Sequence, residues 1–290
     1  MYTSLDVRPG QPSETAVRVC MGRAVAHGVT RIAKLSDPTA LALLPDDARA
    51  RVERVRSATA PRGFRARYER GLLRGLSNMM VARTVEIDDA IRAAPSPQLV
   101  ILGAGLDGRA WRMFELRDVA VFEVDHPDSQ RVKRARAFSL PRAAREVRFA
   151  SVDFERVSLD GALAAAGHDP EQPTTWIWEG VVMYLALRHI EATLAVIERR
   201  SAARSRLIVV YHTPAWMLPL VRIAVRRLGE PLRSSFTAAA MRALLARHGF
   251  AVSRDENVPE IAAALSSELG HAARIMTHLR IVTADMVRAP

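Results

Sequence analysis

The sequence predicts an α/β protein with a mostly parallel sheet, helices on both faces of that sheet, and a helical N-terminal segment. Residues 1–95 contain helical patterns and no clear strand, and the breaker Pro95-Ser96-Pro97 ends them. Short apolar runs then alternate with helical patterns, which is typical of parallel strands buried on both faces. A chain of 290 residues, 49% hydrophobic and 25% charged, can also bury one large core.

The N-terminal segment, residues 1–95, is predicted to form a helical cap over the rest of the chain. Apolar residues recur in it at the spacing of three helices. The second helix is expected to have Asp37 as its N-cap and Pro38 at its first helical position. The three helical patterns span residues 14–27, 39–57 and 64–94.

Residues 96–290 are predicted to form the sheet and its covering helices. Five runs are continuously apolar, and two weaker strand patterns follow near the end of the chain. The expected strands span residues 99–102, 119–124, 147–152, 175–178, 207–211, 250–254 and 279–282. The expected helices span residues 109–116, 128–138, 159–166, 188–203 and 238–248.

An apolar segment near 213–236 contains interspersed arginines. It fits a lid over a substrate pocket, a helix on a membrane surface, or an ordinary packed helix. Because Pro219 would interrupt a long interfacial helix, we favour a lid or a packed helix. No run approaches the roughly 18–20 apolar residues of a membrane span, so no stable membrane insertion is expected.

The chain is strongly basic, with a formal net charge of +11. Its arginines crowd residues 49–74 and 131–148, which fits a surface for nucleic acid or an anionic membrane. No recognisable nucleic-acid motif accompanies them, so we favour solvated helix faces and expect no nucleic-acid partner. Cys20, the only cysteine, excludes an intrachain disulfide and fits a reducing compartment. The N-terminus lacks the apolar core of a signal peptide, so a cytoplasmic location is expected.

The main motif is a predicted strand that ends in Gly103-Ala104-Gly105 ahead of a predicted helix. Glycines there permit a tight turn and let backbone N–H groups approach a ligand closely. Asp125 ends the next strand, where an acid can accept hydrogen bonds from both hydroxyls of an adenosine ribose. With Gly108 the loop also satisfies G-x-G-x-x-G, so both a dinucleotide and S-adenosylmethionine (SAM) fit it.

Five segments together extend this motif: ARTVEIDD at 82–89, LGAGLDGRAWR at 102–112, FEVDHP at 122–127, VDF at 152–154 and WEGVVMYL at 178–185. In this order they resemble the leucine carboxyl methyltransferase-like family of class I SAM-dependent methyltransferases. The resemblance is stronger to the bacterial branch linked to polyketide O-methylation. It covers about residues 15–285 and implies a Rossmann-like methyltransferase sheet. Two positions depart from the family pattern, since Gly108 replaces a frequent threonine and His126 a common glutamine.

The resemblance also implies which residues hold SAM. Arg83 matches the arginine that pairs with the methionine carboxylate, for which a guanidinium is well suited. Asp125 would hold the ribose, and Glu179 matches the acid that follows the fourth strand beside the cofactor. Asp153 and Phe154 would flank the adenine. The full implied set is Arg83, Gly103, Ala104, Gly105, Asp125, His126, Asp153, Phe154, Glu179 and Gly180.

These features predict an enzyme that transfers a methyl group from SAM to a carboxylate or hydroxyl of a small molecule, such as a polyketide-type secondary metabolite. The second product would be S-adenosylhomocysteine (SAH). A carboxylate acceptor needs no base, whereas a phenol or alcohol gains from one, and His212 and Tyr184 are the candidates.

Three other functions stay open at the level of sequence. They are a protein C-terminal carboxyl methyltransferase, an NAD(P)-dependent oxidoreductase, and a non-catalytic protein that binds nucleotides or nucleic acid. No clustered His and Cys pattern predicts a metal site. The sequence gives no indication of the oligomeric state.

Overall fold

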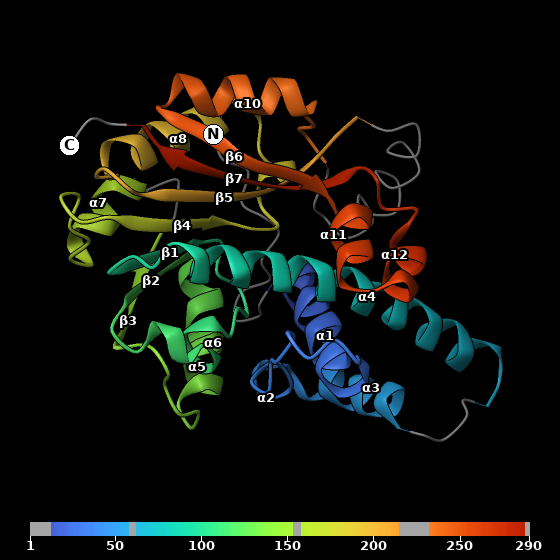
Figure 1. Ribbon diagram of the computed structural model, residues 1–290. Coiled ribbons are helices and arrows are strands. Elements are labelled where there is room, and N and C mark those ends of the chain that lie inside the picture. The colour runs from blue at the N-terminus through green and yellow to red at the C-terminus, as the bar shows by residue number, and fades with distance from the viewer. Residues whose placement is uncertain (1–12, 58–61, 153–157, 215–231, 288–290) are drawn as a thin grey trace.

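The computed structural model describes residues 13–57, 62–152, 158–214 and 232–287. Their strands form one seven-stranded sheet with helices on both faces (Figure 1). The strands are β1 (Gln98–Leu102), β2 (Ala120–Asp125), β3 (Glu146–Ser151), β4 (Thr174–Trp178), β5 (Arg206–His212), β6 (Phe250–Asn257) and β7 (Leu279–Met286).

The strand order across the sheet is β3-β2-β1-β4-β5-β7-β6. The first five strands run parallel, and β7 pairs antiparallel with both β5 and β6. The predicted α/β class with a mostly parallel sheet is therefore confirmed. Strands β6 and β7 extend beyond their predicted ends because their last residues, such as Glu256 and Asp285, are polar and hide the strand pattern.

Among the described residues, four helices precede the sheet and the others lie between its strands in the chain. The first four are α1 (Glu14–Val29), α2 (Ala40–Leu43), α3 (Asp46–Arg56) and α4 (Phe64–Ala93). The later ones are α5 (Arg109–Arg112), α6 (Pro127–Ala137), α7 (Leu159–Ala165), α8 (Leu187–Arg199), α10 (Ala238–Arg247), α11 (Val258–Leu265) and α12 (Ser267–Ala273). Two short 3₁₀ helices are η1 (Phe114–Leu116) and η2 (Val182–Tyr184).

Several helix predictions were wrong in detail. The helix expected over 39–57 is two helices, because Pro45 has no N–H to continue α2 and instead is the N-cap of α3. The N-cap of α2 is Thr39 and not Asp37 as predicted, although Asp37 Oδ1 accepts the N–H of Ala40, the first helical residue, at 3.0 Å. Pro38 also lies before that helix and not at its first position. Helices α11 and α12 were not predicted.

Side chains along each strand alternate between two packed layers. We call the first the α4 layer, in which Leu99 and Ile101 of β1 pack with apolar residues of α4, α5, α11 and α12. The second is the α8 layer, in which Val100 and Leu102 pack with α7, α8 and α10. Figure 1 shows α8 and α10 above the sheet and α4 and α5 below it.

Helices α1 to α3 pack with the first half of α4 into a third apolar cluster below the sheet (Figure 1). Its division from the rest at residue 95 stays a prediction. Most of the predicted lid near 213–236 lies outside the described residues, from 215 to 231. Within the described part of the chain, none of the helices combines the length and apolar composition that crossing a membrane requires.

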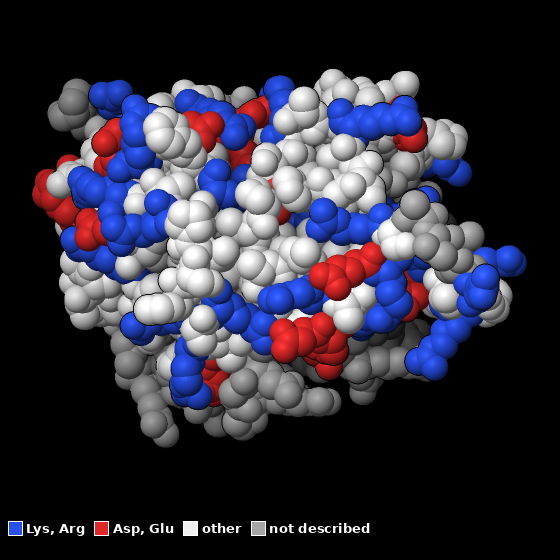
Figure 2. All heavy atoms as spheres, turned by 90° about the horizontal axis from the view of Figure 1, so that it is seen from below, with Lys and Arg blue, Asp and Glu red and all other residues white. Residues whose placement is uncertain are grey.

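Figure 2 shows the charges on the underside of the molecule, on the residues that the structure describes. Arginine and lysine side chains there alternate with acidic ones around a broad uncharged area. A nucleic-acid surface would present a continuous basic field. This face therefore gives no support to that hypothesis.

Candidate functional site

The loop after β1 turns sharply because two of its glycines have positive φ, 68° at Gly103 and 46° at Gly105. The space around them is also closed to side chains. A Cβ on Gly103 would lie 2.3 Å from Cγ2 of Val181, and one on Gly105 would lie 2.9 Å from Cβ of Ala16 in α1. Only glycine satisfies both conditions, so the loop exposes its backbone at the carboxyl ends of the strands.

Asp125, at the end of β2, is held by two backbone N–H groups. Gly105 donates to Oδ2 at 2.5 Å and His126 donates to Oδ1 at 2.7 Å. Burial raises the pKa of Asp125 above its ordinary value, although both bonds favour the charged form. Each carboxylate oxygen can accept a second hydrogen bond, so the carboxyl keeps binding capacity beside the glycine loop.

The two departures from the family pattern have local explanations. His126 is the N-cap of α6, and its Nδ1 accepts the Asp128 N–H at 3.3 Å. Gly108 has a negative φ of −104°, but a Cβ there would lie 2.1 Å from Oγ1 of Thr39. Packing against the N-terminal segment therefore requires Gly108, and the G-x-G-x-x-G spacing does not by itself indicate a dinucleotide.

Arg83 of α4 and Glu179, just after β4, form a buried ion pair. Arg83 Nε lies 2.6 Å from Glu179 Oε1, with side chains 5% and 9% exposed. The contact is short but poorly oriented, because Nε and Nη2 of Arg83 and Oε1 of Glu179 have no hydrogen-bond partner among the described residues. Burial raises the pKa of Glu179, but Arg83 and Arg109 outweigh it and hold the pKa below its ordinary value. Glu179 is therefore an anion whose Oε1 is in the ion pair with Arg83 but accepts no hydrogen bond from the described residues.

Gly180 follows this acid with a positive φ of 73°. A Cβ at Gly180 would meet nothing within 4 Å. The positive φ therefore favours glycine there, and the space beside its Cα is open.

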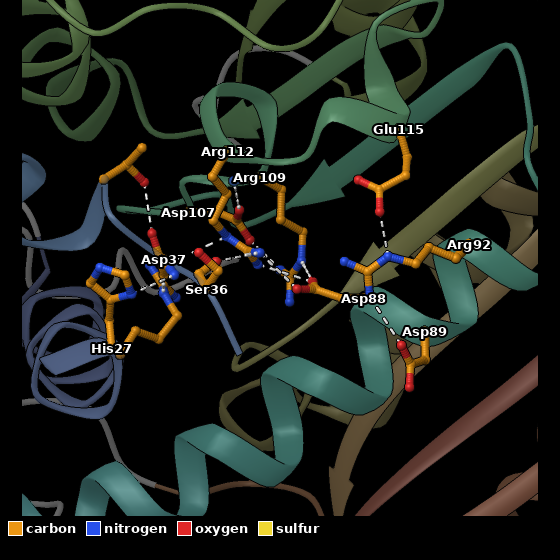
Figure 3. Close-up of polar contacts among 12 residues, drawn as sticks. His27, Ser36, Asp37, Asp88, Asp89, Arg92, Asp107, Arg109, Arg112 and Glu115 are labelled. Carbon is orange, nitrogen blue, oxygen red and sulfur yellow. Dashed lines mark hydrogen bonds and ion pairs between the residues drawn. The ribbon is translucent and has the colours of Figure 1, made fainter. Parts of the chain in front are cut away.

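Arg109, at the start of α5, supports Glu179 from the side away from Arg83. Its Nη1 donates to Glu179 Oε2 at 3.0 Å, and its Nε donates to Asp88 Oδ1 at 2.8 Å. It also pairs with Asp107 and is 1% exposed. Arg112 binds the same Asp88, with Nη1 2.7 Å from Oδ2 (Figure 3).

The contacts continue to the N-terminal segment and back to the glycine loop. Arg112 Nε lies 3.7 Å from Asp37 Oδ2, and Arg23 Nε donates to the same oxygen at 2.9 Å. Arg23 Nη2 then donates to the carbonyl of Leu106 at 2.6 Å. We call this group the buried ion network. Its members are Arg23, Arg83, Arg109, Arg112, Asp37, Asp88, Asp107 and Glu179.

Sequence reasoning singled out only Arg83 and Glu179 of this network. The other arginines are expected to be mostly solvated, and Arg23, Arg109 and Arg112 are buried exceptions. Two of these arginines could have been found from their place in the sequence, since Arg109 and Arg112 both belong to the LGAGLDGRAWR segment.

His212 ends β5, and its ring meets that of His278 edge-on with 5.2 Å between centroids. Burial, with smaller effects from His278 and Arg83, lowers the pKa of His212 to about 4, so the ring is neutral at pH 7. Its Nδ1 is buried without a hydrogen-bond partner among the described residues. His278 was not predicted. Tyr184 is half-buried at the end of η2.

Two predicted adenine contacts, Asp153 and Phe154, lie outside the described residues. A groove of about 380 Å³ lies elsewhere, between α4, α11, β6 and β7. Its charged side chains pair with one another, as in Arg254–Glu86 at 3.0 Å. No three His, Cys, Asp or Glu side chains of the described ranges are grouped to hold a metal ion.

With this geometry in place, the chain was compared with known proteins. A family model described as leucine carboxyl methyltransferase matches residues 16–198, which is more than half of the chain. The match includes the glycine loop, Asp125 and Glu179.

Similar proteins of several bacteria carry provisional names as S-adenosyl-L-methionine-dependent methyltransferases. A Frankia alni protein is 36% identical over 197 residues, which cover 63% of this chain and 66% of that protein. A Streptomyces avermitilis protein is 39% identical over 135 residues, covering 46% of this chain and 48% of that protein. The chain thus spans 48% to 66% of the length of these relatives.

Solved structures share the fold at low sequence identity. A geranyl diphosphate methyltransferase, in complex with GPP and sinefungin, aligns with a TM-score of 0.51 and 15% identity over 76% of this chain and 83% of that one. A Bordetella parapertussis protein aligns with a TM-score of 0.53 and 14% identity over 93% of this chain and 94% of that one. The predicted methyltransferase-type sheet is therefore confirmed as a fold.

Proposed function

The chain belongs to the leucine carboxyl methyltransferase family of SAM-dependent methyltransferases, and from this premise we propose that it transfers the methyl group of SAM to an oxygen of a small molecule. SAH is then the second product. The observation that best supports this proposal is the glycine loop bonded to Asp125, at the same edge of the sheet as the buried Arg83–Glu179 pair.

The residues present fit SAM at both of its ends. Its amino-acid end has a carboxylate and an ammonium group, and the matching charges are the nitrogens of Arg83 and the oxygen of Glu179 that make no hydrogen bond to the described residues. The spare lone pairs of Asp125 suit the ribose hydroxyls. The remaining proposed contacts are Gly103, Ala104, Gly105, His126, Asp153, Phe154 and Gly180.

SAM supplies a methyl group on a sulfonium whose positive charge disappears on transfer. The chain itself has to orient the acceptor oxygen and exclude water. If the acceptor is a hydroxyl, we propose that His212 accepts its proton, because the ring is already neutral at pH 7. Tyr184 is the alternative base, and a carboxylate acceptor requires neither.

We further propose that the acceptor is of low mass, of the kind made in polyketide secondary metabolism, and that the reaction takes place in the cytoplasm. Residues 1–95 would act as a cap over the core, 96–290, with the segment near 213–236 as its lid. The approach of Ala16 to Gly105 supports this arrangement, because it brings α1 over the glycine loop. The family name favours one rival acceptor, the C-terminal carboxylate of a protein.

Calorimetric titration tests the proposal. SAM and SAH should bind, whereas NAD and NADP should not. Binding of NAD without SAM would overturn the methyltransferase proposal. Incubation of a cell extract with methyl-labelled SAM then separates the acceptors, because label in the protein fraction would support the C-terminal carboxylate and label in the low-mass fraction the small molecule.

A further inference from the structure

Arg109 is a buried cation that contacts three carboxylates at once. It reaches Glu179, Asp88 and Asp107 with one planar guanidinium, whose donor geometry a lysine ammonium does not reproduce. Burial lowers the pKa of Arg109, but the three acids outweigh it and raise the pKa well above its ordinary value. Arg109 is therefore charged at neutral pH.

Its hydrogen bond determines how Glu179 is oriented. The bond at 3.0 Å is to Oε2, so the carboxylate plane is held from behind and Oε1 is directed to the side of Arg83. Arg83 itself makes no hydrogen bond of good geometry to Glu179. Without Arg109, Glu179 would be free to turn and pair with Arg83 through both oxygens, because a carboxylate and a guanidinium prefer that arrangement.

Arg109 is in turn fixed by two acids from different parts of the chain. Asp107 accepts the backbone N–H of Arg109 at 2.7 Å and also pairs with its side chain. Asp88, on α4, is shared with Arg112 (Figure 3). The guanidinium is thus held between the glycine loop and α4, which keeps it in one place as the site fills.

We propose that Arg109 is a positioning residue that orients Glu179 toward the amino-acid end of the cofactor and does not itself touch the cofactor. This inference rests on the proposed function. It predicts that a change at Arg109 weakens the binding of ligands that have the amino-acid end and leaves the binding of ligands without it nearly unchanged.

The experiment compares two ligands by calorimetry: SAH, and 5′-methylthioadenosine, which has the same adenosine and thioether but no amino-acid group. Arg109→Lys should weaken SAH binding about tenfold, as expected for one lost hydrogen bond to a charged group. It should change methylthioadenosine binding less than about twofold. A general structural role would weaken both ligands equally, and equal or absent losses would overturn the inference. Failure of the unaltered protein to bind SAH would instead overturn the proposed function.

A second background tests whether Arg109 acts through Glu179. In the Glu179→Gln protein, Arg109→Lys should cause no further loss of SAH affinity, because the oriented carboxylate is already gone. Full additivity would contradict the inference.

Arg92→Gln is the matched control, since Arg92 pairs with Asp89 and Glu115 at the surface of the same region and should not affect either ligand (Figure 3). If Arg109→Lys fails to fold, Asp88→Asn replaces it and should weaken SAH binding selectively about threefold, while an equal loss of both ligands would again overturn the inference.

Discussion

The two layers that cover the sheet bury different kinds of side chain. The α8 layer is filled by large apolar side chains such as Phe122, Trp176 and Tyr211. The α4 layer also has an apolar core, but the buried ion network lies beside it. Both layers pack against the same strands. We therefore attribute the difference in their side chains to function, because the proposed SAM site includes part of the ion network beside the α4 layer.

A buried charge costs free energy unless it is paired, and pairing it rarely stabilises a fold more than an apolar side chain would. Four arginines facing four acids are therefore a poor way to gain stability. They are a good way to hold Arg83 and Glu179 in fixed orientation. The comparison predicts that the α8 layer governs stability alone, whereas changes in the network affect both stability and ligand affinity.

The largest expected effect tests the apolar side of this comparison. Trp176→Ala should lower the free energy of unfolding by about 4 kcal/mol, because a fully buried indole is replaced by a cavity. The bond from its Nε1 to Ser201 Oγ, at 2.9 Å, is lost as well. Denaturant unfolding measures the loss. The folded variant should keep its SAH affinity within about twofold, and a large loss of affinity would show that the layers are not independent.

Asp88→Ala tests the charged side. It should lower the free energy of unfolding by about 3 kcal/mol, because Arg109 and Arg112 lose a shared buried anion. Unlike Trp176→Ala, it should also weaken SAH binding, measured by calorimetry on the folded protein. Unchanged affinity would mean that the network serves stability only.

The sequence predicted the sheet well because each strand is a short apolar run between breakers. It failed where a strand residue is polar, as at Glu256, and where local patterns are weak, as in α12. It also joined α2 and α3, because the apolar spacing continues across Pro45. Local patterns therefore predicted element types better than element ends.

The site was predictable only where chemistry is concentrated in a motif. Gly103, Gly105 and Asp125 follow from strand ends and glycine spacing, and they come together as predicted. Arg23 and Asp37 could not be found in this way, because their burial depends on contacts between distant segments. In a chain with so many arginines, residue type alone does not distinguish a buried arginine from a solvated one.

Asp125→Ala tests whether a residue of the α4 side can affect SAH affinity without affecting the free energy of unfolding. SAH affinity should fall at least about 30-fold, or about 2 kcal/mol, because the ribose hydroxyls lose a charged acceptor. The free energy of unfolding should change by no more than about 1 kcal/mol, since loss of a buried charge offsets the two lost backbone bonds. Calorimetry and denaturant unfolding measure the two effects. Unchanged affinity would remove Asp125 from the proposed ribose contact.

The pH dependence of stability separates the layers further. His168 is buried in the α8 layer between Phe122 and Trp176, and burial, then Arg200, lowers its pKa from 6.5 to about 4. Between these pH values the unfolded chain binds a proton that the folded protein does not, so stability should fall by about 1–2 kcal/mol as the pH drops from 6.5 to 4. Glu123 has the opposite effect. Burial raises its pKa to about 7, so its contribution to the free energy of unfolding falls as the pH rises from 4.5 to 7. His168→Gln should therefore reduce the acid loss relative to the unaltered protein, and an unchanged slope would contradict the assignment.

The smallest expected effect comes from the residue next to Asp88. Asp89 pairs with Arg92 at 3.0 Å (Figure 3) and with Lys34 at 2.9 Å, but its side chain is 38% exposed. Water and salt screen such pairs, so Asp89→Asn should cost less than about 1 kcal/mol of unfolding free energy. Raising the salt concentration should remove most of that cost, whereas the cost of Asp88→Ala should persist, because the buried network is shielded from ions. Equal salt dependence of the two variants would contradict the claim that adjacent carboxylates on α4 belong to different electrostatic environments.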